Sequence, residues 1–102
     1  MPRTVAWTLT ARQDLLSAVQ HLLEQEAPGA AARLIDQIEA AAGALDELSE
    51  RGRAVPELGL PRRELIVGGY RLVYRVRGDE VQILRLIHGR QNFISSWRKT
   101  PQ

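Results

Sequence analysis

Cysteine is absent from this chain of 102 residues, which excludes disulfides, thiolate metal sites and a cysteine nucleophile. Imidazole is scarce as well, because His21 and His88 are the only histidines. A transition-metal site would depend mostly on carboxylates, and we expect neither a metal nor a cofactor. No apolar run approaches the roughly 20 residues of a membrane span, and the first residues lack the apolar stretch of a signal peptide. We therefore expect a cytoplasmic protein that makes no membrane contact.

The length and composition are those of one globular domain. Domains commonly hold roughly 100–150 residues, so we expect a single domain over residues 1–102. Hydrophobic residues are 44% of the chain and charged residues 25%, which is too apolar a composition for a disordered chain.

Charge is distributed unevenly along the chain. Residues 1–50 hold three arginines and eight carboxylates, a net charge of −5, whereas residues 51–102 hold ten arginines, one lysine and four carboxylates, a net charge of +7. Arginine suits bidentate recognition of carboxylate or phosphate. A basic second half of this kind predicts a surface that an acidic partner segment can cover.

The first half of the chain has the pattern of one strand and two helices. Residues 4–9 alternate apolar and polar side chains, which predicts a half-buried strand. The sequence T-A-R-Q from Thr10 to Gln13 resembles a capping box, so a helix is expected to begin there and to end at the Pro-Gly pair at 28–29. A second helical pattern covers residues 30–50. Two helices joined by so short a turn are expected to form an antiparallel hairpin.

The second half changes to the period of strands. Residues 52–61 hold two prolines and two glycines and are expected to form a loop. Three strands follow, separated by Gly-Gly at 68–69 and Gly-Asp at 78–79, and the last of them ends at His88. The predicted order is β-α-α-β-β-β. This is an α+β fold with an N-terminal helical hairpin packed on one face of a twisted, mainly antiparallel sheet.

The pairing of the last two strands decides which side chains face the helices. We expect the turn at residues 78–79 to pair Arg77 with Glu80, which places Tyr74 opposite Ile83. The core-facing set is then Tyr70, Leu72, Tyr74, Val76, Val81, Ile83 and Ile87. The opposite face holds Arg71, Arg75, Arg77, Val73, Leu84, Leu86 and His88.

This arrangement predicts the environments of two arginines. Arg85, on the core-facing side, is expected to pair with a helix carboxylate such as Asp36 or Glu39. Arg71, on the opposite face, is expected to be exposed, so that its replacement by alanine costs little stability.

Three adjacent blocks carry a resemblance to a known family. The strand YRLVYRV at residues 70–76, the apolar strand VQILRLI at 81–87 and the ending HGR at 88–90 resemble the RelE/ParE toxin superfamily. The resemblance covers about residues 4–92, and residues 91–102 form a C-terminal extension. It implies the toxin of a type II toxin–antitoxin pair, neutralised by a cognate, ParD-like antitoxin encoded beside it.

The superfamily contains two kinds of toxin. RelE-type members cut mRNA on the ribosome, and ParE-type members bind DNA gyrase. As a ribonuclease, this chain would use Arg71 for the phosphate and His88 and Glu64 for proton transfer. However, Gly89 and Arg90 follow His88 where the nucleases place a tyrosine, and the lysine cluster of RelE-type members is missing. The resemblance therefore favours a gyrase inhibitor, with the endoribonuclease as the alternative and no catalytic residue assigned.

The surface residues are assigned to two partners. We expect Arg71, His88 and Arg90 to face the target, DNA gyrase. The antitoxin is expected to contact Arg75, Arg77, Val73, Leu84 and Leu86. Operator DNA is contacted only indirectly, through the antitoxin, and a third interpretation is that the toxin acts only within such a repressor. The apolar residues of the C-terminal extension, Phe93, Ile94 and Trp97, have the spacing of a short amphipathic turn. We expect them to pack on the helical hairpin, and the alternative is a mobile tail that contacts a partner.

Overall fold

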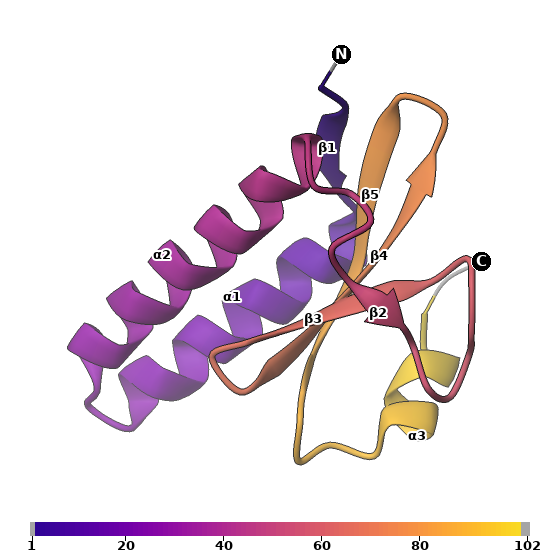
Figure 1. The fold of residues 1–102 in the computed structure, drawn as a ribbon. Helices are drawn as coiled ribbons and strands as arrows, with labels where there is room; N and C mark the ends of the chain where they lie inside the picture. Colours follow the sequence, from indigo (N-terminus) through magenta and orange to yellow (C-terminus); the bar gives the residue numbers. More distant parts are fainter. Residues whose placement is uncertain (1, 101–102) are drawn as a thin grey trace.

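The computed structural model describes residues 2–100 (Figure 1). Its five strands form one sheet, and the two long helices lie side by side as an antiparallel hairpin on one face. None of the helices in residues 2–100 is long and apolar enough to cross a membrane. The elements are β1 (Thr4–Trp7), α1 (Leu9–Glu24), α2 (Pro28–Gly43), the 3₁₀ turn η1 (Ala44–Asp46), β2 (Arg53–Ala54), β3 (Arg63–Val67), β4 (Tyr70–Arg77), β5 (Glu80–His88) and α3 (Phe93–Arg98).

The sheet has the strand order β1-β5-β4-β3-β2. β1 runs parallel to β5, and the other neighbouring strands are antiparallel. The predicted α+β fold is confirmed. The short edge strand β2, within the expected loop, was not predicted, and the helix α3 lies where the C-terminal extension has the spacing of a short amphipathic turn.

The first helix begins two residues earlier than its sequence suggested. Thr8, not Thr10, is the N-cap of α1, and its hydroxyl oxygen accepts a hydrogen bond from the backbone N–H of Ala11 at 3.1 Å. The same hydroxyl donates to the carbonyl of Leu84 at 3.1 Å. Thr8 therefore ties the start of α1 to the edge of β5, a tertiary contact that no local pattern contains.

The second helix also begins earlier than expected, at Pro28 rather than at residue 30. Proline suits the first turn of a helix, because the backbone N–H that it lacks would have no partner there. The helical pattern expected to reach residue 50 ends at Gly43 and continues as the single turn η1.

A β-bulge changes the predicted pairing of β4 with β5. From Arg77 with Glu80 to Tyr74 with Ile83 the predicted register is correct. Between Val73 and Tyr74 the register shifts, because β5 contains one extra residue, and Val73 then pairs with Arg85. A one-residue shift exchanges the two faces of a strand beyond the bulge.

The exchange moves Leu86, Ile87 and His88 out of their predicted environments. His88 was expected on the face opposite the helices, but it pairs with Tyr70 and lies on the side of the helices. Leu86 faces the helices and Ile87 faces outward, the reverse of the prediction. The inner core, between the sheet and the helices, contains Ala11, Ala18, Leu34, Ile38, Ala42, Leu45, Leu72, Tyr74, Val81, Ile83 and Leu86. The outer cluster, on the opposite face, contains Val55, Val73, Ile87 and Phe93, with Leu58, Leu84 and Trp97 packed against it.

Tyr74 anchors the segment between the helices and β2. Its ring is 0% exposed, and its hydroxyl accepts from the N–H of Gly52 and donates to the carbonyl of Ser49, both at 2.8 Å. Burial raises the pKa of this phenol, which keeps it protonated as a donor.

The Tyr74→Phe substitution is expected to lower the free energy of unfolding by about 1–3 kcal/mol, because it leaves two buried backbone groups without partners. Urea denaturation measures the change. Tyr70→Phe is the matched control, since the Tyr70 hydroxyl makes no hydrogen bond within residues 2–100. Equal stabilities for the two variants would contradict this role of the Tyr74 hydroxyl.

Candidate functional site

The residues singled out from the sequence lie on both faces of the sheet. Arg71 and Glu64 are on the outer face, where their side chains meet at 2.7 Å. His88 faces the opposite side, against the ring of Tyr70 and toward the helices. The structure therefore does not bring together the three residues of the ribonuclease alternative.

A network of ion pairs surrounds Arg71 on the outer face. Both terminal nitrogens of its guanidinium donate to Glu57, at 2.6 and 2.8 Å, and its Nε donates to Glu64 Oε1 at 2.7 Å. The other carboxylate oxygen of Glu64 accepts from Arg53 Nε at 2.9 Å and lies 2.8 Å from Arg53 Nη2. We call Arg53, Glu57, Glu64 and Arg71 the Arg71 network.

The helix α3 covers this network. The Arg71 guanidinium carbon lies 3.9 Å from the centroid of the Phe93 ring, and the Phe93 ring stacks on Trp97 at 6.0 Å. Hence the Arg71 side chain is only 15% exposed and that of Glu64 is 0% exposed. The expectation of an exposed Arg71 is wrong. The prediction that the C-terminal extension packs on the helical hairpin is wrong, because Phe93 and Trp97 pack on the outer face of the sheet and Ile94 is exposed.

The ion pairs hold these groups in their charged forms. Hydrogen bonding to Arg71 lowers the pKa of Glu57, and the same contact raises the pKa of Arg71 further above its ordinary value. Two carboxylates take three of the five N–H donors of Arg71 and balance its charge, which weakens its attraction for an incoming phosphate.

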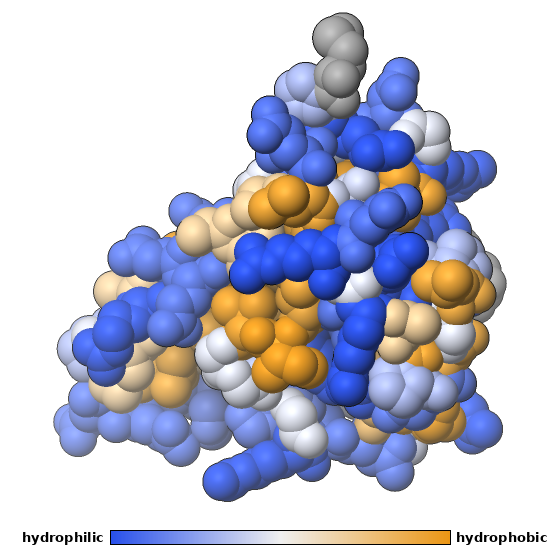
Figure 2. Space-filling view, in the orientation of Figure 1, coloured by the Kyte–Doolittle hydropathy of each residue, from blue (hydrophilic) through white to orange (hydrophobic). Residues whose placement is uncertain are grey.

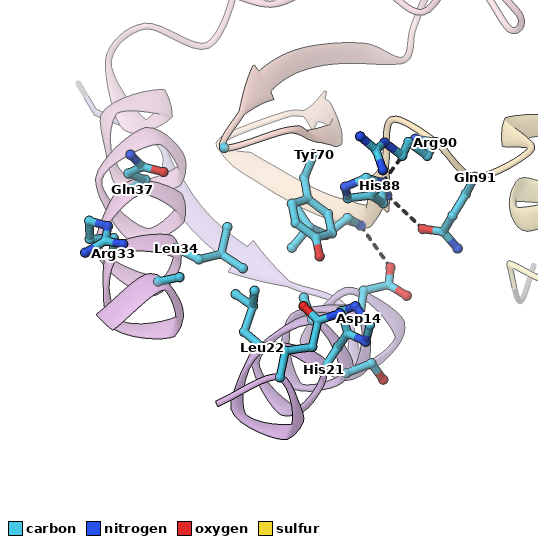
Figure 3. Close-up of a pocket in the computed structure, with 16 residues that line it drawn as sticks. Asp14, His21, Leu22, Arg33, Leu34, Gln37, Tyr70, His88, Arg90 and Gln91 are labelled. Atoms are coloured by element: carbon cyan, nitrogen blue, oxygen red, sulfur yellow. Dashed lines mark hydrogen bonds between the residues drawn. The ribbon is translucent and has the colours of Figure 1, made fainter. Parts of the chain in front are cut away.

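A groove opens on the other face of the sheet. It has a volume of about 980 Å³ and lies between α1, α2 and the end of the β3–β4 hairpin. Figure 3 shows Tyr70 between Leu34 of α2 and His88 of β5, above Leu22 of α1. Burial raises the pKa of the Tyr70 phenol. The groove combines apolar side chains with cationic ones, namely Leu22, Leu34, Tyr70 and Leu86 with Arg33 and Arg90.

The histidine at the end of β5 is held by its neighbours in the chain. Its backbone N–H donates to Gln91 Oε1 at 2.8 Å, and its ring Nδ1 accepts from the N–H of Arg90 at 3.1 Å. The Tyr70 ring packs edge-on against it, with centroids 4.9 Å apart. With Nδ1 as acceptor, the neutral imidazole carries its proton on Nε2.

The Gly-Gly turn of the β3–β4 hairpin shapes one wall of the groove. Gly68 and Gly69 have φ of 58° and 83°, in the left-handed region that glycine favours. A Cβ on Gly68 would lie 2.9 Å from Gln37 Oε1 and 3.1 Å from Leu34 Cδ1. Glycine therefore lets the hairpin end approach α2 closely.

Sequence reasoning missed Asp14, the partner of Arg85. Arg85 Nε donates to Asp14 Oδ2 at 2.7 Å, and that oxygen also accepts from the backbone N–H of Leu86 at 2.9 Å. The expected partners, Asp36 and Glu39, are exposed on α2. The available signal was helical spacing, because Asp14 follows Ala11 by three residues and precedes Ala18 by four, and both alanines are buried.

The residues assigned to the antitoxin differ in accessibility. Val73 is fully buried and presents no surface to a partner in this conformation, and Leu86 is nearly buried where it lines the groove. Leu84 is half-buried beside α3. Arg75 donates to Gln82 Oε1 at 2.7 Å, and Arg77 is exposed. The predicted open face of mixed arginines and apolar residues is therefore largely closed by the chain itself.

No cluster of three or more potential metal ligands occurs among residues 2–100. Cutting RNA through the 2′-hydroxyl needs a base, an acid and a cation at one phosphate. Arg71 with Glu64 and His88 with Tyr70 lie on opposite faces of the sheet. The groove, on the side of the helices, is accessible from solvent.

Comparisons with known proteins all find toxins or toxin–antitoxin systems. A family model described as the ParE toxin of the type II toxin–antitoxin system parDE matches residues 5–93. Toxin RelE1 of Caulobacter vibrioides is 36% identical over 93 residues, which are 87% of this chain and 96% of that protein.

Two solved structures are similar in fold. A chain of the chromosomal ParDE system from P. aeruginosa is 25% identical, with a TM-score of 0.72, over 84% of this chain and 95% of that one. A chain of the toxin–antitoxin complex RelBE2 from Mycobacterium tuberculosis is 32% identical, with a TM-score of 0.59, over 86% of this chain and 99% of that one.

Proposed function

Because the chain belongs to the ParE toxin family, within the RelE/ParE group of type II toxins, we propose that it inhibits DNA gyrase by protein–protein contact and that a cognate antitoxin neutralises it. One observation supports binding over catalysis most strongly. Arg71 is paired with two carboxylates beneath α3, and His88 lies on the opposite face of the sheet. The three residues that the ribonuclease alternative would use are therefore not assembled at one site, which supports action by contact.

The alternative is a RelE-type endoribonuclease, favoured by the 36% identity to Toxin RelE1. Incubating the purified chain with translating ribosomes and mapping the mRNA ends separates the two functions. We expect no codon-dependent cuts. Cuts made by the parent chain and lost in His88→Ala would establish the ribonuclease and overturn the proposal.

The groove is the proposed binding site of the antitoxin. The ParDE and RelBE2 systems pair a related toxin with an antitoxin. The groove offers apolar contacts at Leu22, Leu34 and Tyr70, and cations at Arg33 and Arg90. An antitoxin segment with apolar anchors and carboxylates complements both. Figure 2 shows hydrophobic surface over β3. The exposed Ile66 of this strand pairs with Arg71 and therefore lies on the outer face of the sheet, outside the groove.

Neutralisation follows from the position of the proposed target contacts. His88 and Arg90 line the groove, so a segment bound there would cover them. Arg71, beneath α3, is not accessible for the same purpose. The target-facing set is therefore reduced to His88 and Arg90.

Reversing the groove's charge is expected to slow antitoxin association about tenfold in the double variant Arg33→Glu with Arg90→Glu, because complementary charges act mainly on the association rate. Biolayer interferometry with the product of the neighbouring gene measures the rate at low salt. Arg98→Glu, an exposed arginine of α3, is the control. Unchanged association of the double variant, with slowing in Arg77→Glu, would move the antitoxin to β4.

A further inference from the structure

The outward face of α1 carries three exposed leucines that belong to neither the inner core nor the outer cluster. Leu9, Leu16 and Leu23 are 71%, 57% and 51% exposed. They are seven residues apart, and seven residues are two helical turns with a drift of about 20°, so they form one line along the helix. We call this line the leucine stripe. Leucine side chains this exposed, aligned on one helix, are typical of a contact surface.

The stripe is separate from the groove. The groove is lined from α1 by Asp14, Ser17, His21 and their neighbours, and it includes none of the three leucines. Leu15 and Leu22, beside the stripe, turn toward the inner core. A partner on the stripe therefore leaves the groove open.

We infer that the stripe binds the stripe of a second copy of this chain, in antiparallel orientation. The spacing is symmetric about Leu16. A two-fold axis at this residue therefore places Leu16 against Leu16 of the second copy, and Leu9 against Leu23 of the second copy. Such a surface is self-complementary, which is the condition for a closed two-fold dimer.

The charges beside the stripe favour the antiparallel orientation. Arg12 is exposed in the first half of α1 and Glu24 is exposed at its end. Antiparallel helices bring Glu24 to the N-terminal end of the partner helix, the positive end of its dipole. Parallel helices would instead oppose Arg12 to Arg12 and Glu24 to Glu24. The uncharged Gln13 and Gln20 face each other across the antiparallel contact.

The contact is small. A helix of 16 residues is about 24 Å long, and one helix against another buries less surface than a standard protein interface. We expect a reversible dimer with a dissociation constant on the order of tens of micromolar.

Sedimentation equilibrium tests the dimer. The parent chain is expected to be part dimer at 100 µM, and Leu16→Glu is expected to be monomeric, because it places two carboxylates on the axis. Leu60→Glu, at an exposed leucine outside α1, is the control and is expected to dimerise like the parent. A monomeric parent, or a dimer that survives Leu16→Glu, would overturn the inference.

Single cysteines test the orientation, since the chain has none of its own. With copper-phenanthroline as the oxidant, Leu16→Cys is expected to form a disulfide-linked dimer. A mixture of Leu9→Cys and Leu23→Cys is expected to link position 9 to position 23. Links from 9 to 9 and from 23 to 23 would exclude the antiparallel dimer.

The antitoxin is the competing occupant of the stripe. Leu16→Glu and the parent chain are expected to bind the neighbouring gene product equally well, because the groove is unchanged. A loss of antitoxin binding in Leu16→Glu would assign the stripe to the antitoxin and overturn the self-association.

Discussion

Replacing Asp14 by alanine is expected to lower the free energy of unfolding by about 3–5 kcal/mol, the usual cost of leaving one member of a buried ion pair without its partner. The side chains of Arg85 and Asp14 are only 9% and 16% exposed. Arg85 also donates to the carbonyl of Ser96, at 2.6 Å, and to the hydroxyl of Thr100, at 2.9 Å. One ion pair thus connects α1, β5 and the end of α3.

Guanidinium chloride denaturation measures this effect. Asp36→Ala, an exposed carboxylate on α2, is the control and is expected to change stability by less than about 0.5 kcal/mol. Asp14→Asn is expected to retain the bond from the Leu86 N–H and to lose less than Asp14→Ala. If Asp14→Ala unfolds like Asp36→Ala, the ion pair does not hold these elements together.

Replacing Arg71 by alanine is expected to cost about 3 kcal/mol, because it leaves the buried Glu64 with Arg53 as its single partner among the network residues. It also removes the cation above the Phe93 ring. Arg71→Lys is expected to restore only part of the loss, since an ammonium cannot make the paired contact with Glu57. Thermal melts of both variants against the parent chain measure this, and an unchanged melt for Arg71→Ala would contradict it.

The acid limb of the stability curve provides a second measurement. The pKa of Glu57 is lowered from its ordinary 4.5 by the bond to Arg71. The contribution of the ionised Glu57 to folding stability is therefore fully present above pH 4.5 and is lost as the pH falls through the lowered pKa. Arg71→Ala removes the cause of that shift, so the difference in stability between parent and variant is expected to shrink on acidification. A constant difference from pH 7 to pH 3 would contradict the ion pair.

Because Arg71→Ala is expected to destabilise the fold, it is a poor probe of which residues are needed for toxicity. A non-toxic Arg71→Ala variant would report a loosened α3 as much as a lost contact. His88→Ala and Arg90→Ala are better probes, because both residues line the groove and neither is fully buried.

The sequence predicted the order of elements but not the outward face of the sheet. Alternation located β4 and β5, and their turn set the register correctly as far as Tyr74 and Ile83. The bulge was not predictable from pattern, because Leu86 and Ile87 are both apolar and either suits the inner core. Asp14 accepts from the N–H of Leu86, a contact between residues 72 apart in sequence that holds β5 in its observed register.

Tertiary packing also explains why the residues selected from the sequence do not all lie together. Arg71, Glu64 and His88 were selected individually, but which face each residue occupies depends on tertiary packing. The cover over Arg71 comes from Phe93 in the C-terminal extension and from Glu57 in a segment expected to be a plain loop. The groove requires α1, α2 and the hairpin turn together, so no local pattern contains it.

Supercoiling of relaxed plasmid by purified DNA gyrase tests the central claim most directly. The purified chain, added in excess over gyrase, is expected to inhibit supercoiling or to accumulate cleaved DNA complexes. The neighbouring antitoxin is expected to restore activity, and Arg90→Glu is expected to inhibit less while melting like the parent. Full supercoiling in the presence of a folded chain that still arrests growth when expressed would contradict the account.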